Sequence, residues 1–140
     1  MIEIESKSQL GELPKLLEAV RTQAKEFGLS EQALYEFEVA SEEAIVNVML
    51  YAYPESVGPM LLEISKEGDA FVLTIKDRGI AFDPTLDPPK VEADAPLEMR
   101  DEGGLGIYFM FAYSTKLSYK REDGWNILRL ERDRKEPDAF

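Results

Sequence analysis

The sequence predicts an α+β two-layer sandwich, in which helices cover one face of a mainly antiparallel mixed sheet. Two stretches near the N-terminus repeat apolar residues at helical spacing, two pairs of Leu-, Ile- and Val-rich segments meet at glycine-containing turns, and a third helical stretch separates these pairs. Helices must bury one face, and two hairpins supply a sheet against which to bury it. With 140 residues, we expect a single domain over residues 1–140.

The first part of the chain predicts one strand and two helices. Residues 1–6 alternate apolar and acidic side chains, as a short strand does. Over residues 9–27 apolar side chains recur three and four apart, which predicts an amphipathic helix that ends at Gly28. Ser30 is a suitable N-cap for a second helix over residues 31–52, which must stop before the Tyr-Pro pair that follows.

The second part predicts two hairpins separated by a long loop and a helix. The paired hairpin segments are 59–66 with 70–76, and 115–121 with 125–132. The loop, residues 78–103, contains four prolines and seven acidic residues without a clear period, which is typical of a functional lid, taken as about 80–103. We expect a helix from about Leu105 and a frayed tail over residues 133–140.

Composition excludes several classes of function. A net charge of −12 disfavours nucleic-acid binding, because phosphate recognition needs clustered Lys and Arg. The chain contains no Cys and no His, which excludes a thiolate nucleophile, a Cys-type zinc site, a Ser-His-Asp triad and imidazole acid–base catalysis. No apolar run approaches twenty residues, and the N-terminus lacks the blocks of a signal peptide. We therefore expect a cytoplasmic protein without a membrane partner.

Glu43 and Asn47 lie four residues apart in the second expected helix, so they project from the same face. A carboxylate at this position can orient and deprotonate a hydroxyl group or water, and the amide oxygen of Asn47 can ligate a hard cation such as Mg²⁺. Taken alone, the pair fits a solvated glutamate beside an incidental asparagine better.

The segment Asp77 to Pro84 follows an expected strand. An aspartate that ends a buried strand can accept a hydrogen bond from the amino group of a purine, and Gly79 lets a ring approach the backbone. Taken alone, the segment is an ordinary strand-to-loop turn, in which Asp and Gly are common.

The sequence Glu102-Gly103-Gly104-Leu105-Gly106 opens the third expected helix. Its glycines free the backbone to direct several N–H groups at a phosphate, and the helix N-terminus adds a positive dipole. It is not a Walker loop, because no Gly-Lys-Ser/Thr follows, and it is not a dinucleotide fingerprint, because the strand is not typical of a parallel sheet. A phosphate site and a flexible hinge fit this segment equally well.

The three motifs occur in one order, and together they resemble the Bergerat-fold ATPases, most closely the anti-sigma-factor serine kinases. The likeness extends from about residue 34 to residue 132. The matching segments are Ser41 to Asn47 with Tyr51-Ala52-Tyr53, Asp77-Arg78-Gly79 with Phe82-Asp83-Pro84, Gly103 to Ile107, and Tyr119-Lys120-Arg121 with Gly124 and Asn126. Ordered motifs of this kind are far more specific than any one of them.

The resemblance implies a role for each matching residue. It makes Glu43 the general base and Asn47 the ligand of Mg²⁺, with ATP as the bound nucleotide. It makes Asp77 the residue that binds adenine and Gly79 the residue that shapes the adenine pocket. The remaining nucleotide-contacting positions that we expect are Ala81, Phe82, Arg100, Gly103, Gly104, Leu105 and Gly106.

Several of these positions have distinctive features. Ala81 stands where many relatives have a second glycine, and Tyr51 stands where many have histidine. Phe82 fits a core plug beneath the lid better than a base stacker. Arg100 fits a γ-phosphate contact and an exposed loop charge equally well. Arg78 can likewise pair with an acidic neighbour such as Asp83.

The resemblance further implies partners. Members of the family transfer the γ-phosphate of ATP to a serine of a STAS-domain anti-anti-sigma protein, commonly form homodimers and sequester a sigma factor. Two alternatives share the same motifs. One is a non-catalytic protein-binding module in which ATP orders the lid. The other is a stand-alone histidine-kinase-type catalytic domain that acts on a separate phosphoacceptor.

Overall fold

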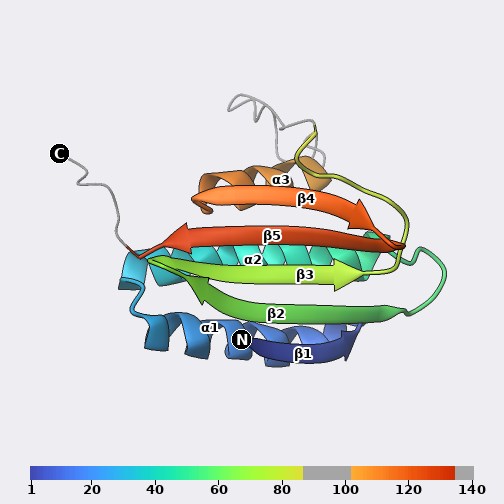
Figure 1. Ribbon diagram of the computed structural model, residues 1–140. Helices are drawn as coiled ribbons and strands as arrows, with labels where there is room; N and C mark the ends of the chain where they lie inside the picture. The colour runs from blue at the N-terminus through green and yellow to red at the C-terminus, as the bar shows by residue number, and fades with distance from the viewer. Residues whose placement is uncertain (87–101, 135–140) are drawn as a thin grey trace.

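The computed structural model describes residues 1–86 and 102–134, with the backbone alone for residues 102–105. Strands and helices follow one another along the chain in the order that the sequence predicts (Figure 1). In chain order the elements are β1 (Ile2–Lys7), the 3₁₀ turn η1 (Leu10–Glu12), α1 (Leu13–Phe27), α2 (Glu31–Tyr51), β2 (Pro59–Glu67), β3 (Ala70–Asp77), α3 (Glu102–Ala112), β4 (Lys116–Glu122) and β5 (Trp125–Asp133).

The described strands form one five-stranded sheet in the order β1-β2-β3-β5-β4. Every pairing between these strands is antiparallel, so the described part contains none of the parallel pairs that a mixed sheet implies. Figure 1 shows α1 and α2 behind the sheet and α3 beside β4. The predicted α+β two-layer sandwich is therefore confirmed.

The core lies between the helices and the inner face of the sheet. Apolar residues of α1 and α2 meet alternate residues of β2, β3 and β5, as the pleat of a strand requires. At its centre Phe37 of α2 contacts Phe71 of β3 edge to face, with ring centroids 5.6 Å apart. Phe27 of α1 also reaches Phe71, with centroids 5.8 Å apart. The aromatic contacts fix both helices on the same strand.

The first helical stretch is split, where the sequence predicts one continuous helix. Residues 10–12 form a 3₁₀ turn, and the α-helix begins at Leu13, next to Pro14. Proline has no N–H to donate and fits the first turn of a helix, so the α-helix starts there. The predicted caps are confirmed: Gly28 adopts φ +102°, and Ser30 Oγ accepts a hydrogen bond from the backbone N–H of Ala33 at 3.1 Å.

The final strand is longer than the sequence predicts. Asp133 of β5 pairs with Ala70 of β3, and the backbone N–H of Arg134 donates to the carbonyl oxygen of Asp69 at 2.6 Å. The Arg134 side chain also pairs with Asp69 and lies 4.7 Å over the ring of Phe27. The prediction that the tail frays from residue 133 is therefore wrong for its first two residues. Residues 135–140 lie outside the described part.

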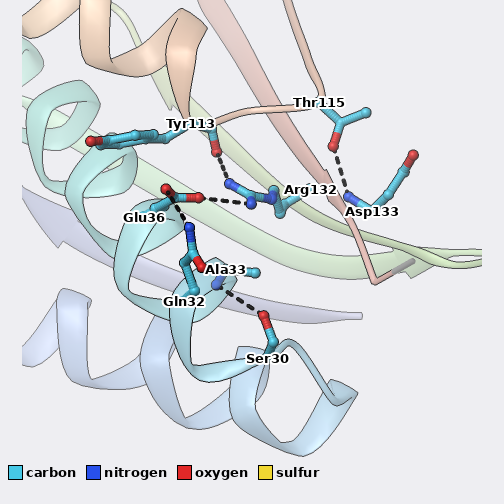
Figure 2. Close-up of polar contacts among 8 residues, drawn as sticks. All are labelled: Ser30, Gln32, Ala33, Glu36, Tyr113, Thr115, Arg132 and Asp133. Carbon is cyan, nitrogen blue, oxygen red and sulfur yellow. Dashed lines mark hydrogen bonds and ion pairs between the residues drawn. The ribbon is translucent and has the colours of Figure 1, made fainter. Parts of the chain in front are cut away.

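A buried arginine ties three elements together at the end of the sheet away from Asp77. Arg132 of β5 is 8% exposed; its guanidinium donates to Glu36 of α2 at 2.9 Å and to the carbonyl oxygen of Tyr113 after α3 at 3.0 Å (Figure 2). Because the guanidinium has several donors in a fixed plane, one side chain joins a strand to two helices.

The third helix begins at Glu102, three residues before the predicted start at Leu105. Glycine accepts helical dihedral angles, and an acidic residue in a first turn is favoured by the helix dipole, so the glycine-rich segment forms this turn. Of the predicted lid, residues 87–101 lie outside the described part. No helix within the described part combines the length and the apolar character needed to cross a membrane.

Candidate functional site

The C-terminal half of α2 and the first turns of α3 enclose a pocket of about 190 Å³. Three predicted site residues line it: Glu43 and Asn47 from α2, and Gly106 from α3. The four-residue spacing on α2 puts both polar side chains on the face that α3 covers. The remaining wall is formed by Val46, Leu50, Tyr51, Ile107 and Met110. The structure thus joins two motifs that are about sixty residues apart in sequence.

Glu43 is the polar group that the pocket perturbs most clearly. Its carboxylate is partly buried, and burial raises the pKa of Glu43 above its ordinary value; the charge of neighbouring Glu42 raises this pKa further. Gly106 lies directly against it, since a Cβ atom on Gly106 would be 2.6 Å from Glu43 Oε2. A carboxylate that is desolvated and closely packed suits a group that accepts a proton.

Asp77 ends β3 and is 4% exposed. Its Oδ1 accepts two hydrogen bonds, from the backbone N–H of Gly79 at 2.8 Å and from Nδ2 of Asn126 at 2.8 Å. Asn126 lies opposite Asp77 in the register of β3 and β5, which brings the two side chains together. A buried carboxylate held in this way can recognise a hydrogen-bond donor of a ligand.

The turn that follows Asp77 packs on the C-terminal end of α2. The backbone N–H of Ile80 donates to the carbonyl oxygen of Ala52 at 2.9 Å, and a Cβ atom on Gly79 would collide with this same oxygen. Ala52 lies five residues after Asn47, which is about 7.5 Å along a helix. The Asp77 turn therefore adjoins the pocket of Glu43 and Asn47, although Asp77 itself does not line that pocket.

Tyr53 connects this turn to the sheet. Its hydroxyl group donates to the carbonyl oxygen of Pro59 at 2.7 Å and accepts from the backbone N–H of Arg78 at 2.7 Å. Its ring covers Gly58 so closely that a Cβ atom there would collide with it. Burial raises the pKa of Tyr53 above its ordinary value, and the protonated hydroxyl can donate.

Other predicted site residues are not brought into the pocket. Ala81 is exposed and Phe82 is 41% exposed, so the interpretation of Phe82 as a core plug is wrong. The expected pair of Arg78 with Asp83 is also wrong: the Arg78 guanidinium lies 4.8 Å over the ring of Trp125. Asp83 Oδ1 instead accepts from the backbone N–H and the hydroxyl group of Thr85.

The remaining predicted residues lie before or at the start of α3. Arg100 lies outside the described residues. Gly103, Gly104 and Leu105 lie in the first turn of α3, where only the backbone is described. The sequence predicts that Gly103 and Gly104 lie in a loop before the helix, whereas the structure places them within the helix.

Sequence reasoning assigned no role to Asn126, Arg121 or Tyr53. In the sequence motifs, the first two are only part of a closing hairpin, and Tyr53 is only part of a Tyr-Ala-Tyr segment. Each acts through a neighbour that is distant in sequence: Asn126 through Asp77, Arg121 through the carbonyl oxygen of Gly79 at 2.8 Å, and Tyr53 through Arg78. A polar residue in an otherwise apolar strand segment is the signal that marks Asn126.

A divalent cation would have few protein ligands here. Within residues 1–86 and 102–134, no three acidic side chains converge as a metal-binding group. Mg²⁺ commonly takes one or two protein ligands and completes its shell with phosphate oxygens and water. The amide oxygen of Asn47, in a pocket that also contains Glu43, fits this kind of site.

A nucleotide-binding domain of the ATPase class is expected to combine these features: an antiparallel sandwich, an acid and an amide on α2, and a glycine-rich start of α3. Residues 7–132 match the family described as histidine kinase-like ATPase domain. The chain belongs to this family, which confirms the family-level prediction from the sequence motifs.

Two kinds of curated relative are similar to the chain. Over 95 residues it is 34% identical to serine/threonine-protein kinase BtrW of Bordetella bronchiseptica, covering 66% of this chain and 65% of BtrW. Over 122 residues it is 25% identical to serine-protein kinase RsbW of Bacillus cereus, covering 83% of this chain and 76% of RsbW. RsbW of Bacillus mycoides is 24% identical over the same length. The match thus spans just under two thirds of BtrW.

Proposed function

We propose that this protein is an ATP-dependent serine-protein kinase of the anti-sigma-factor type. The observation that carries the proposal is the pocket in which Glu43 and Asn47 of α2 meet Gly106 of α3. The names of BtrW and RsbW, both protein kinases, support the same reaction class.

In this proposal Glu43 is the general base. Its carboxylate accepts the proton of the serine hydroxyl as the serine oxygen bonds to the γ-phosphorus and the bond to the ADP oxygen breaks. Because burial raises the pKa of Glu43, the carboxylate is a better proton acceptor than an ordinary exposed glutamate. No His and no Cys are available in the chain for this task.

Asn47 is proposed as the protein ligand of Mg²⁺, and Asp77 as the acceptor for the amino group of adenine. When bound, Mg²⁺ neutralises the charge that builds up on the phosphate oxygens. This neutralisation matters more than usual here, because the chain itself carries a net charge of −12. Gly79 would leave room for the base, and the backbone around Gly103, Gly104 and Gly106 would face the phosphates.

The proposed protein substrate is a STAS-domain anti-anti-sigma protein, and the proposed consequence is control of a sigma factor. Both rest on the resemblance to the anti-sigma-factor serine kinases and not on a contact in this chain. The acidic charge favours protein partners with basic surfaces over nucleic acid.

The test is transfer of labelled phosphate from Mg-ATP to a cognate STAS protein. Wild type should transfer, Glu43→Gln should lose about 100-fold or more of the rate, as expected for removal of a positioned general base, and Glu42→Gln should keep it. Glu42 is the matched control, because it is the adjacent carboxylate and is exposed. Equal rates in wild type and Glu43→Gln would refute the assigned role.

The product and the binding data separate the two alternatives. Phosphoserine survives acid whereas phosphohistidine does not, so an acid-labile product would favour the histidine-kinase-type reaction. Binding of Mg-ATP by calorimetry without transfer to any partner would favour the non-catalytic module.

A further inference from the structure

The end of the sheet beside Asp77 contains a polar network that the transfer chemistry does not use. Its centre is Asn126 of β5, which is 5% exposed. Asn126 Nδ2 donates to Asp77 Oδ1 and to the carbonyl oxygen of Ile80, each at 2.8 Å. Asn126 Oδ1 accepts from the hydroxyl group of Tyr119 and from Nη1 of Arg121, the latter at 3.0 Å. All four hydrogen-bonding positions of one buried amide are thus used.

The neighbours of Asn126 determine which way its amide points. A guanidinium has donors only, so the group that faces Arg121 must be the amide oxygen. A backbone carbonyl has acceptors only, so the group that faces Ile80 must be the amide nitrogen. The usual ambiguity between the two ends of an asparagine side chain is therefore absent. Asn126 necessarily presents a donor to Asp77.

This fixed donor leaves one oxygen of Asp77 for a ligand. Oδ1 accepts from the backbone N–H of Gly79 and from Asn126, whereas Oδ2 has no hydrogen-bond partner among the described residues. Within the described part, Ser114 Oγ is the side-chain polar atom that is fully buried without a hydrogen-bond partner. Asp77 Oδ2 also lacks a partner but is not fully buried, so it keeps access to the surroundings. An ionised carboxylate oxygen in that position can only accept.

We propose that Asn126 is a positioning residue for base selection, which holds Asp77 so that the site takes a 6-amino purine and rejects a 6-oxo purine. The inference rests on the proposed function, because it takes Asp77 as the residue that contacts the base. A 6-amino group donates a hydrogen bond to Oδ2, whereas a 6-oxo group would place an acceptor against an acceptor. Buried polar groups that are left unpaired discriminate strongly between ligands.

Arg121 extends the network to the backbone of the turn. Its Nη1 donates to the carbonyl oxygen of Gly79 at 2.8 Å as well as to Asn126. One guanidinium therefore fixes both the amide that orients Asp77 and the turn that follows Asp77. Because two elements are held by one planar group, a ligand meets a preorganised acceptor.

The fixed amide also predicts an inversion of preference. In Asp77→Asn, both neighbours on the Oδ1 side remain donors, namely the Gly79 N–H and Asn126 Nδ2. The new side chain must turn its oxygen towards them and its nitrogen towards the ligand. The ligand-facing atom then changes from an acceptor to a donor, which favours the 6-oxo purine.

The experiment measures by calorimetry the Kd of Mg-ATP and of Mg-inosine triphosphate, which differ at the purine 6-position. Wild type should prefer ATP, and Asn126→Leu should lower this preference about tenfold, which corresponds to one unmade hydrogen bond. Asp77→Asn should prefer inosine triphosphate, and Asn126→Leu added to it should weaken that inverted preference. The control is Arg129→Ala, also on β5, whose side chain pairs with Glu67 and Glu131 and should leave the preference unchanged.

Three outcomes are decisive. If Asn126→Leu still binds ATP and prefers it over inosine triphosphate as strongly as wild type does, the positioning role is overturned. If Asn126→Leu does not fold, Asp77→Asn provides the test, because it keeps every hydrogen bond of the network. If the nucleotide preference of Asp77→Asn does not shift towards inosine triphosphate, the proposal fails. Failure of the wild type to bind either nucleotide would instead refute the proposed function.

Discussion

Gly106 brings α3 against the carboxylate of Glu43, with Oε2 only 2.6 Å from where a Cβ atom of residue 106 would be. Two segments that the sequence separates by sixty-two residues meet at this point. The contact explains why a residue without a side chain is needed inside a helix, where glycine is otherwise unfavourable.

Gly106→Ala should slow phosphate transfer without destabilising the fold. The new methyl group would displace the end of the flexible Glu43 side chain, and a displacement of about 1 Å of a catalytic group can cost on the order of 100-fold in rate. Helix propensity gains up to ~1 kcal/mol from the same change. The measurements are kcat and thermal unfolding, and Gly11→Ala is the control, because its Cβ would meet open space. Equal slowing in both variants would contradict the prediction.

Glu43→Gln should be more stable than wild type at pH 7 and lose this advantage in acid. Since burial raises the pKa of Glu43, the folded state binds the proton more tightly than the unfolded state. The stability that this group contributes is complete below its unfolded pKa of about 4.3 and is lost as the pH rises through the folded value. Unfolding in urea from pH 4 to pH 8 measures the difference. A stability difference that stays constant from pH 4 to pH 8 would contradict the prediction.

Gly79→Ala should destabilise the protein by about 1–3 kcal/mol, as expected for overpacking against the backbone. The added Cβ would meet the carbonyl oxygen of Ala52, which cannot rotate away as a side chain can. The same change displaces the turn beside Asp77, so ATP affinity should fall as well. Chemical denaturation and calorimetry measure the two effects. An unchanged free energy of unfolding would show that the turn relaxes freely.

Tyr53→Phe should lower the free energy of unfolding by about 0.5–1.5 kcal/mol, because it removes the hydrogen bonds to the N–H of Arg78 and the carbonyl oxygen of Pro59, both of which water can partly replace. The ring contact with Gly58 is retained. Tyr51→Phe is the matched control: its hydroxyl makes no hydrogen bond to the described residues, and its loss should change stability by less than about 0.5 kcal/mol. Urea unfolding of both variants compares them directly.

Arg132→Met should cost about 1–3 kcal/mol of stability, because it leaves the partly buried Glu36 and the carbonyl oxygen of Tyr113 without the guanidinium that pairs with them. Lys120→Met on the neighbouring strand β4 should cost less than about 1 kcal/mol, since both Lys120 and its partner Glu122 are exposed. The difference between the two midpoints in urea is the measurement. Similar losses would argue that the Arg132 pair contributes no more than a surface pair.

Local signals predicted the elements well wherever a side chain acts on its own backbone. Gly28 ends α1 in a left-handed conformation, and Ser30 caps α2 through its own hydroxyl group. The Asp123-Gly124 turn of the last hairpin has φ of 53° and 83°, as the sequence indicates. The exceptions lie at element ends, such as the split at Pro14 and the early start of α3 at Glu102, where propensity alone is weakest.

The sequence by itself determined the fold class and the face of α2 that carries Glu43 and Asn47, because helical periodicity is a local property. Only the tertiary structure decided what meets that face and what holds Asp77. Gly106, Asn126 and Arg121 reach the site through helix packing and strand register, and these depend on contacts between residues far apart in the chain. A sequence pattern does not specify such contacts. The sequence therefore predicted Gly106 as a site residue but not its contact with Glu43, and the contacts of Asn126 and Arg121 became visible only in the folded molecule.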